Sequence, residues 1–202
     1  SSLYALPLKY IYVNCRLDRT PTSILSRMTK VLGLEFPSRG YEQQEVMDFI
    51  YNSVVAEGRK LFLILDEVSS LISHGEDGFI YALTRMGEIW GRSPLAMLIV
   101  SKDLGFLWTL DESVKSSLQK LVVKLQPYTS EQLYEIIISR AEEALEQNSL
   151  QDEAARLISV IAGEFGDARY AIELLYRAAI TAQSSGSSSI SVSDVQSARK
   201  SL

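Results

Sequence analysis

A chain of 202 residues with 47% hydrophobic content and a formal net charge of −5 has enough apolar material for a sizeable core, which excludes a disordered protein and predicts one domain, or one domain with a small satellite. Its single cysteine and single histidine exclude an internal disulfide and argue against zinc catalysis, and the acidic balance argues against binding nucleic acid through overall charge. Without an apolar stretch of membrane-spanning length or an opening leader, we expect a soluble intracellular protein with no membrane partner.

Apolar, strand-like runs alternate with amphipathic helical patterns from Lys9 to about Leu125. This alternation predicts a parallel sheet with crossover helices. The predicted strands are Tyr10 to Asn14, Leu61 to Leu65, Ala96 to Ser101 and Leu121 to Leu125. The predicted helices are Thr22 to Leu32, Gln43 to Glu57, Phe79 to Trp90 and Asp111 to Gln119.

The pattern changes to helices alone after Pro127 and Tyr128, so we predict an α/β domain over residues 1–127 and a helical domain over 128–202. Thr129 and Gln132 have the spacing of a capping box, which predicts a helix from there to about residue 147. Further helices are predicted from Asp152 to Phe165, from Ala168 to Gln183, and from Ser191 onward.

The strand-like run Leu61 to Leu65 is apolar at every position and ends in Asp66 and Glu67. A run of this kind is typical of a central parallel strand, and ligands of open α/β sheets gather at the carboxyl ends of such strands. There Asp66 would hold Mg²⁺ through water, and Glu67 would orient the water that attacks a γ-phosphate, which is the Walker B pattern. The alternative is an acidic pair that caps the following helix.

The sequence contains no G-x-x-x-x-G-K-[ST] loop and no Gly-Lys dipeptide, the elements that cradle nucleotide phosphates in a P-loop protein. In a P-loop fold that loop would precede the first predicted strand. We therefore expect the sequence to begin just after such a loop, either because it was trimmed or because the protein lacks one. Nucleotide binding by these residues alone is expected to be weak.

Five segments occur in a characteristic order: YVNC, LFLILDEV, LAMLIVSKD, QPYTSEQL and GDARYAIELL. Over nearly the whole chain they resemble the AAA+ ATPases, and specifically the archaeal origin-recognition and cell-division-control replication initiators. The resemblance implies a parallel RecA-like AAA+ sheet with flanking helices, followed by a small all-α lid domain. The family's winged-helix domain would follow Leu202.

The resemblance also implies roles for single residues. Arg169 matches sensor 2, a lid arginine that reaches the nucleotide phosphates, although the position also suits an ordinary exposed helix arginine. Ser101 and Lys102 match sensor 1, where Lys102 replaces the expected asparagine. The arginine finger falls near Ser113, and Lys115 is the nearest cation, a point charge that lacks the guanidinium fork.

The insertion that contacts DNA in this family matches Arg16 to Gly40. It carries five basic residues against two acidic ones, 5 − 2 = +3, in an otherwise acidic chain. Arg27, Lys30 and Arg39 are the candidate DNA contacts. Arg27 and Lys30 are three apart and would share one side of a helix, and Arg39 in the PSRG turn would present a cation to phosphate. The alternative is a solvated helix with ordinary charges.

The resemblance implies a replication initiator module that binds ATP or ADP with Mg²⁺, helps to recognise origin double-stranded DNA, and works with other initiator subunits and the replicative helicase in the cytoplasm, at the nucleoid. The missing phosphate loop means that we do not expect these residues to hydrolyse ATP alone. Two alternatives stay open: a non-hydrolysing AAA+ paralogue that serves as a regulatory interaction platform, and a signalling ATPase of related architecture.

Overall fold

The computed structural model describes residues 8–35, 40–89, 94–103, 105–118 and 121–202. The chain divides into two compact units, residues 1–122 and residues 123–202. The domain boundary predicted after residue 127 remains a prediction, a few residues beyond this division. No helix in the described ranges is both long and apolar enough to cross a membrane.

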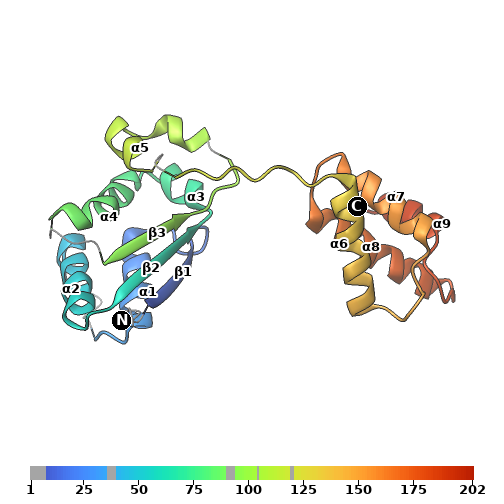
Figure 1. The fold of residues 1–202 in the computed structure, drawn as a ribbon, viewed down its shortest axis with the longest axis horizontal. Coiled ribbons are helices and arrows are strands. Elements are labelled where there is room, and N and C mark those ends of the chain that lie inside the picture. The colour runs from blue at the N-terminus through green and yellow to red at the C-terminus, as the bar shows by residue number, and fades with distance from the viewer. Residues whose placement is uncertain (1–7, 36–39, 90–93, 104, 119–120) are drawn as a thin grey trace, which may run out of the picture. The chain divides into compact units, whose positions relative to one another are not determined.

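The first unit is built on a parallel sheet of three strands in the order β1, β2, β3 (Figure 1). The strands are β1 (Leu8–Asn14), β2 (Lys60–Asp66) and β3 (Leu95–Ile99), so the first three predicted strands are confirmed. Around the sheet lie α1 (Pro21–Leu32), α2 (Gln43–Ala56), α3 (Val68–Ser73), α4 (Asp77–Ile89), the 3₁₀ helix η1 (Gly105–Thr109) and α5 (Glu112–Leu118). The predicted parallel α/β architecture with flanking helices is therefore correct.

One face of the sheet carries the core of this unit. Side chains alternate between the two faces of a strand, and Ile11, Val13, Leu63 and Leu65 point to the buried face. The apolar sides of the helices pack against them with Ile24, Met28, Ile50, Leu71 and Ile80, all almost completely buried. Burial at every second position explains why these segments form strands covered by amphipathic helices.

The opposite face of the sheet is apolar but exposed. Tyr10, Tyr12 and Leu98 are 72%, 50% and 46% exposed, and they lie in rows with Phe62 and Ile64 of β2. On β2, Phe62 and Ile64 of this face are followed by Asp66 at the strand tip. The exposed face therefore leads to the candidate site described below.

The predicted strand from Leu121 to Leu125 is wrong. The segment has no regular secondary structure, and Leu121, Val123 and Leu125 are 93%, 83% and 85% exposed. An apolar run becomes a strand only where a neighbouring strand supplies backbone partners, and no described strand pairs with this segment. Helices α3 and η1 were not predicted, since elements of one or two turns show no clear periodicity.

The second unit contains α6 (Ser130–Ala144), α7 (Asp152–Gly163), α8 (Ala168–Ser184) and α9 (Val192–Arg199). Its own core includes Leu133, Ile137, Ile158, Leu174 and Val195. The predicted capping box is confirmed, because Thr129 Oγ1 accepts from the Gln132 amide and the Gln132 side chain accepts from the Thr129 amide. The helical lid follows the α/β unit as the sequence predicts.

A glycine holds the turn before α6 against the start of α8. Gly166 has a φ of 61°, and its carbonyl accepts a hydrogen bond of 3.2 Å from the Tyr128 amide. A Cβ atom added to Gly166 would lie 2.3 Å from Cβ of Pro127. The Pro-Tyr turn and the Gly-Asp corner are thus in direct contact, and only glycine fits between them.

We expect Gly166→Ala to destabilise the helical unit by about 2 to 4 kcal/mol, because the left-handed backbone and the clash with Pro127 both act against it. Urea unfolding followed by circular dichroism measures the change. Gly186→Ala is the matched control: Gly186 has a φ of 73° and no atom within 4 Å, so this variant should lose only about 1 kcal/mol. Equal losses in the two variants would contradict the close contact.

Cys15 is fully buried, and burial is the main cause that raises the pKa of its thiol to about 11, with smaller contributions from Asp18 and Asp66. We therefore expect the native chain to react with a thiol reagent at neutral pH at least about a hundredfold more slowly than the urea-unfolded chain. The measurement is the labelling rate across a urea titration. Rapid labelling without urea would show that the first unit opens readily.

Candidate functional site

The carboxyl ends of the three strands meet at one edge of the sheet, where the predicted catalytic residues lie. Asn14 of β1 and Asp66 of β2 are partners in the parallel register, and Ser101 and Lys102 follow β3. The ladder continues beyond the strands, with Cys15 N–H donating to the Asp66 carbonyl at 2.8 Å and Val100 N–H donating to the Leu65 carbonyl at 2.8 Å. Asp66 and Ser101 therefore belong to neighbouring strand tips, as expected for a ligand site of a parallel sheet.

Two donors hold the carboxylate of Asp66. Its Oδ1 atom accepts from the Glu67 amide at 2.9 Å, and its Oδ2 atom accepts from the Tyr12 hydroxyl at 2.6 Å. The hydrogen bond to this carboxylate is the main cause that raises the pKa of Tyr12. Sequence reasoning missed Tyr12, because its alternating strand pattern alone does not show that the ring reaches the neighbouring strand tip.

Glu67 has φ 55° and ψ 40°, a left-handed conformation that is rare for a residue other than glycine. It occupies the N-cap position of α3, but its side chain makes no capping hydrogen bond. Glu67 therefore caps α3 through its backbone, since its carbonyl accepts from the Ser70 amide at 3.0 Å, and its carboxylate is left out of the cap. Left-handed non-glycine residues cost about 1 kcal/mol or more and concentrate at functional sites, which fits a carboxylate placed for chemistry.

The loop after β3 is organised by its own hydrogen bonds. Ser101 Oγ donates to the Asp103 carbonyl at 2.6 Å, and Asp103 Oδ1 accepts from the Gly105 amide at 2.9 Å. Lys102 is exposed beside them. The strand tips thus bring Ser101 and Lys102 to the same edge as Asp66, although the direct side-chain contact at this edge joins Asp66 to Tyr12.

Lys115, the candidate substitute for an arginine finger, forms an ion pair of 2.9 Å with Glu112 on the same helix, and its side chain is 15% exposed. A largely buried, paired lysine is poorly placed to reach a neighbouring molecule. The proposed finger role receives no support from this geometry.

The described residues contain no group of three or more His, Cys, Asp or Glu side chains arranged to hold a metal ion. Mg²⁺ commonly uses only one or two protein carboxylates, with water and phosphate oxygens as its other ligands. Asp66 fits that role, since it presents hard carboxylate oxygens at a partly exposed strand tip, where water bound to the ion can reach them.

In the lid, the predicted sensor residue sits in a well-defined helix start. Asp167 caps α8 by accepting from the Arg169 amide at 2.8 Å and from the Tyr170 amide at 3.2 Å. Arg169 is exposed in the first turn, and no described residue forms an ion pair with its guanidinium. The cap fixes the backbone of Arg169, while its role as sensor 2 stays a prediction.

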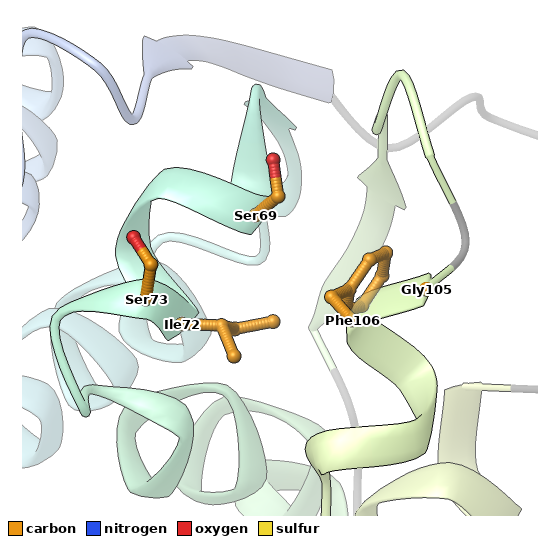
Figure 2. A pocket seen from close by; sticks show the side chains of 5 residues that line it. All are labelled: Ser69, Ile72, Ser73, Gly105 and Phe106. Atoms are coloured by element: carbon orange, nitrogen blue, oxygen red, sulfur yellow. The ribbon is translucent and has the colours of Figure 1, made fainter.

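A shallow cavity of about 310 Å³ lies beside this edge, between α3 and η1 (Figure 2). Ser69, Ile72 and Ser73 line it from α3, and Gly105 and Phe106 line it from η1. Among the described residues, none of those that line the cavity carries a charge, so they do not supply the cationic groups that bind phosphate. Sequence reasoning missed this cavity, because neither short helix was predicted.

Two of the three predicted DNA-contacting residues lie on α1. Arg27 and Lys30 are exposed on α1, and Arg39 lies outside the described residues. The Arg27 guanidinium pairs with Asp18 at 2.6 Å, which offsets part of its charge. Arg19 donates to the Arg16 carbonyl at 2.8 Å, so these two exposed arginines extend the basic surface into the turn before the helix.

Comparison with known proteins gives a consistent result. Residues 134–200 match the model of the Cdc6 AAA+ ATPase-type lid domain. The chain is 32% identical over 207 residues to an ORC1-type DNA replication protein of Thermococcus kodakarensis, covering 100% of this chain and 50% of that protein. It is 31% identical over 191 residues to ORC1-type DNA replication protein 1 of Sulfurisphaera tokodaii, covering 94% of this chain and 48% of that protein.

Solved structures agree. Cdc6p of Pyrobaculum aerophilum superimposes with a TM-score of 0.86 at 28% identity, over 96% of this chain and 53% of that one. The ORC2 protein of Aeropyrum pernix, solved as ADPNP-ADP complexes, superimposes with a TM-score of 0.84 at 28% identity, over 98% of this chain and 53% of that one. The ORC1 protein of the same organism, solved in complex with DNA, superimposes with a TM-score of 0.82 at 29% identity, over 97% of this chain and 51% of that one.

A parallel sheet followed by a helical lid of the Cdc6 type places the chain in the AAA+ ATPase class. Within that class, the chain belongs to the family of Cdc6 and ORC1-type DNA replication proteins. It spans about half the length of the curated relatives it matches.

Proposed function

We propose that the chain is the AAA+ part of a DNA replication initiator, which binds ATP or ADP at the carboxyl edge of β1, β2 and β3 and contributes to origin recognition and helicase loading. The observation that carries the proposal is the carboxylate of Asp66, held by two donors at the tip of the central strand. The nucleotide complexes of the related ORC2 protein support the same ligand class.

The residues at this edge divide the work. Asp66 accepts hydrogen bonds from water bound to the cation, and Glu67 orients and polarises the attacking water. Mg²⁺, when bound, neutralises charge on the phosphate oxygens. Arg169 in the lid binds phosphate through its planar fork of donors, so the phosphate state biases the position of the lid.

The proposed partners are origin double-stranded DNA, other initiator subunits and the replicative helicase, in the cytoplasm at the nucleoid. The related ORC1 protein was solved with DNA, and the exposed cations Arg16, Arg19, Arg27 and Lys30 supply a local basic surface in an acidic chain. Binding to DNA phosphates requires local cations, and this surface supplies them although the chain as a whole has a net charge of −5.

A second candidate is a non-hydrolysing AAA+ paralogue that acts as a regulatory platform for other proteins. Lys102 replaces the amide expected at sensor 1, and Lys115 is engaged by Glu112. Both features would weaken hydrolysis without affecting the fold, and they support this candidate. The signalling ATPase alternative loses support, because the family model and the relatives above belong to replication proteins.

Glu67→Gln tests the catalytic proposal. In the native protein we expect ATP to bind normally and hydrolysis to fall by about a hundredfold or more, because an amide is a poor base for the attacking water. Radiolabelled ATP binding and single-turnover hydrolysis give the two values. Glu76→Gln, in the loop after α3, is the matched control and should hydrolyse ATP normally. Absence of nucleotide binding in all forms would favour the platform alternative.

The double variant Arg27→Glu and Lys30→Glu tests the DNA surface. We expect affinity for a duplex to fall about tenfold or more. The negative slope of log K against log salt should become shallower by about 2, because two phosphate contacts are lost. Fluorescence anisotropy at several salt concentrations measures both. The exchange variant Asp18→Arg with Arg27→Glu keeps the ion pair and the local charge, so it should bind nearly as the native protein does. An unchanged slope in the double variant would remove α1 from the DNA interface.

A further inference from the structure

Tyr12 contacts the acidic strand tip but has no role in the scheme above. It lies on the exposed face of β1, opposite Ile64 in the register, and its hydroxyl reaches diagonally along the sheet to Oδ2 of Asp66 at 2.6 Å. Its ring is half exposed, so burial of the ring does not explain the placement of the hydroxyl.

We propose that Tyr12 is a positioning residue that fixes the carboxylate of Asp66 for a hydrated divalent cation carrying a nucleotide. The inference rests on the proposed function of the strand edge and adds to it a residue from the neighbouring strand. It concerns the orientation of Asp66, whose two oxygens each accept one hydrogen bond from a donor of defined direction.

The physical basis is the rotation of a carboxylate about its Cβ–Cγ bond, which is broad and nearly twofold for aspartate. The Glu67 amide is fixed by the backbone and restrains Oδ1, and the Tyr12 hydroxyl restrains Oδ2 from the neighbouring strand. Each carboxylate oxygen has two acceptor sites, so one bond to each leaves a further site for water bound to the cation. Tyr12 thus orients Asp66 without occupying the position that the cation requires.

Residues that hold a metal ligand from outside commonly change metal affinity by 10- to 100-fold when they are removed. Tyr12→Phe keeps the ring and its packing and deletes only the hydroxyl. Tyr10→Phe is the matched control, since Tyr10 lies on the same face of the same strand, opposite Phe62 and farther from the strand tip. A hydroxyl lost there should leave Asp66 unaffected.

The first measurement is the carboxyl carbon resonance of Asp66 in the isotopically labelled 202-residue chain at neutral pH. We expect this resonance to move in Tyr12→Phe and to stay in place in Tyr10→Phe. If it stays in place in both variants, the hydroxyl does not hold the carboxylate, and the inference is overturned whether or not the protein binds nucleotide.

The second measurement is ATP affinity of the native protein with Mg²⁺ and with EDTA. We expect Tyr12→Phe to reduce the Mg²⁺-dependent gain in affinity about tenfold and to leave the affinity in EDTA unchanged. In an Asp66→Ala background, Tyr12→Phe should have no further effect. A merely structural role would instead lower both affinities and the thermal stability together.

The outcomes separate the two proposals. If the resonance moves but the Mg²⁺-dependent gain is unchanged, Tyr12 holds Asp66 without serving the cation, and the inference fails while the proposed nucleotide site stands. If the native protein binds no nucleotide in either medium, the proposed nucleotide function fails, and the role of Tyr12 toward the cation fails with it.

Discussion

The parallel pairing of β2 with β1 and β3 is the constraint on which the candidate site depends. Parallel strands place their carboxyl ends at one edge, and the backbone bonds from Cys15 to Asp66 and from Val100 to Leu65 extend this alignment past the strands. Asp66, Tyr12 and the loop at Ser101 come together because of this register. A shift of one residue in either pairing would turn Tyr12 or Asp66 to the opposite face of the sheet.

The helical unit depends on a local constraint of a different kind. Gly166 adopts a left-handed conformation against Pro127, and Asp167 then caps the first turn of α8. These contacts determine where the helix begins and hence where the backbone of Arg169 lies. The sensor role proposed for Arg169 would require such a rigid attachment, since a loosely held arginine would transmit little of its binding energy to the helices.

The first unit combines a complete core on one face of its sheet with an apolar, exposed surface on the other. Ile11, Val13, Leu63 and Leu65 are buried, whereas Tyr10, Tyr12 and Leu98 in the alternate positions are exposed. The apolar segment from Leu121 to Leu125 is exposed as well. Its apolar composition suits a strand, but composition does not supply the hydrogen-bonding neighbour that a strand requires.

The elements whose signals are local can be read from the amino-acid sequence. The apolar run before Asp66, the capping box at Thr129 and the Gly-Asp start of α8 are legible because propensity, capping and periodicity act over a few residues. Which side chains meet depends on the folded chain. The hydroxyl of Tyr12 reaches Asp66 across 54 positions of the sequence, Arg27 pairs with Asp18 on the surface, and the run at Leu121 remains unpaired. These outcomes depend on how the strands are aligned and on whether a partner side chain or neighbouring strand lies close by. Neither can be read from a single segment of the sequence.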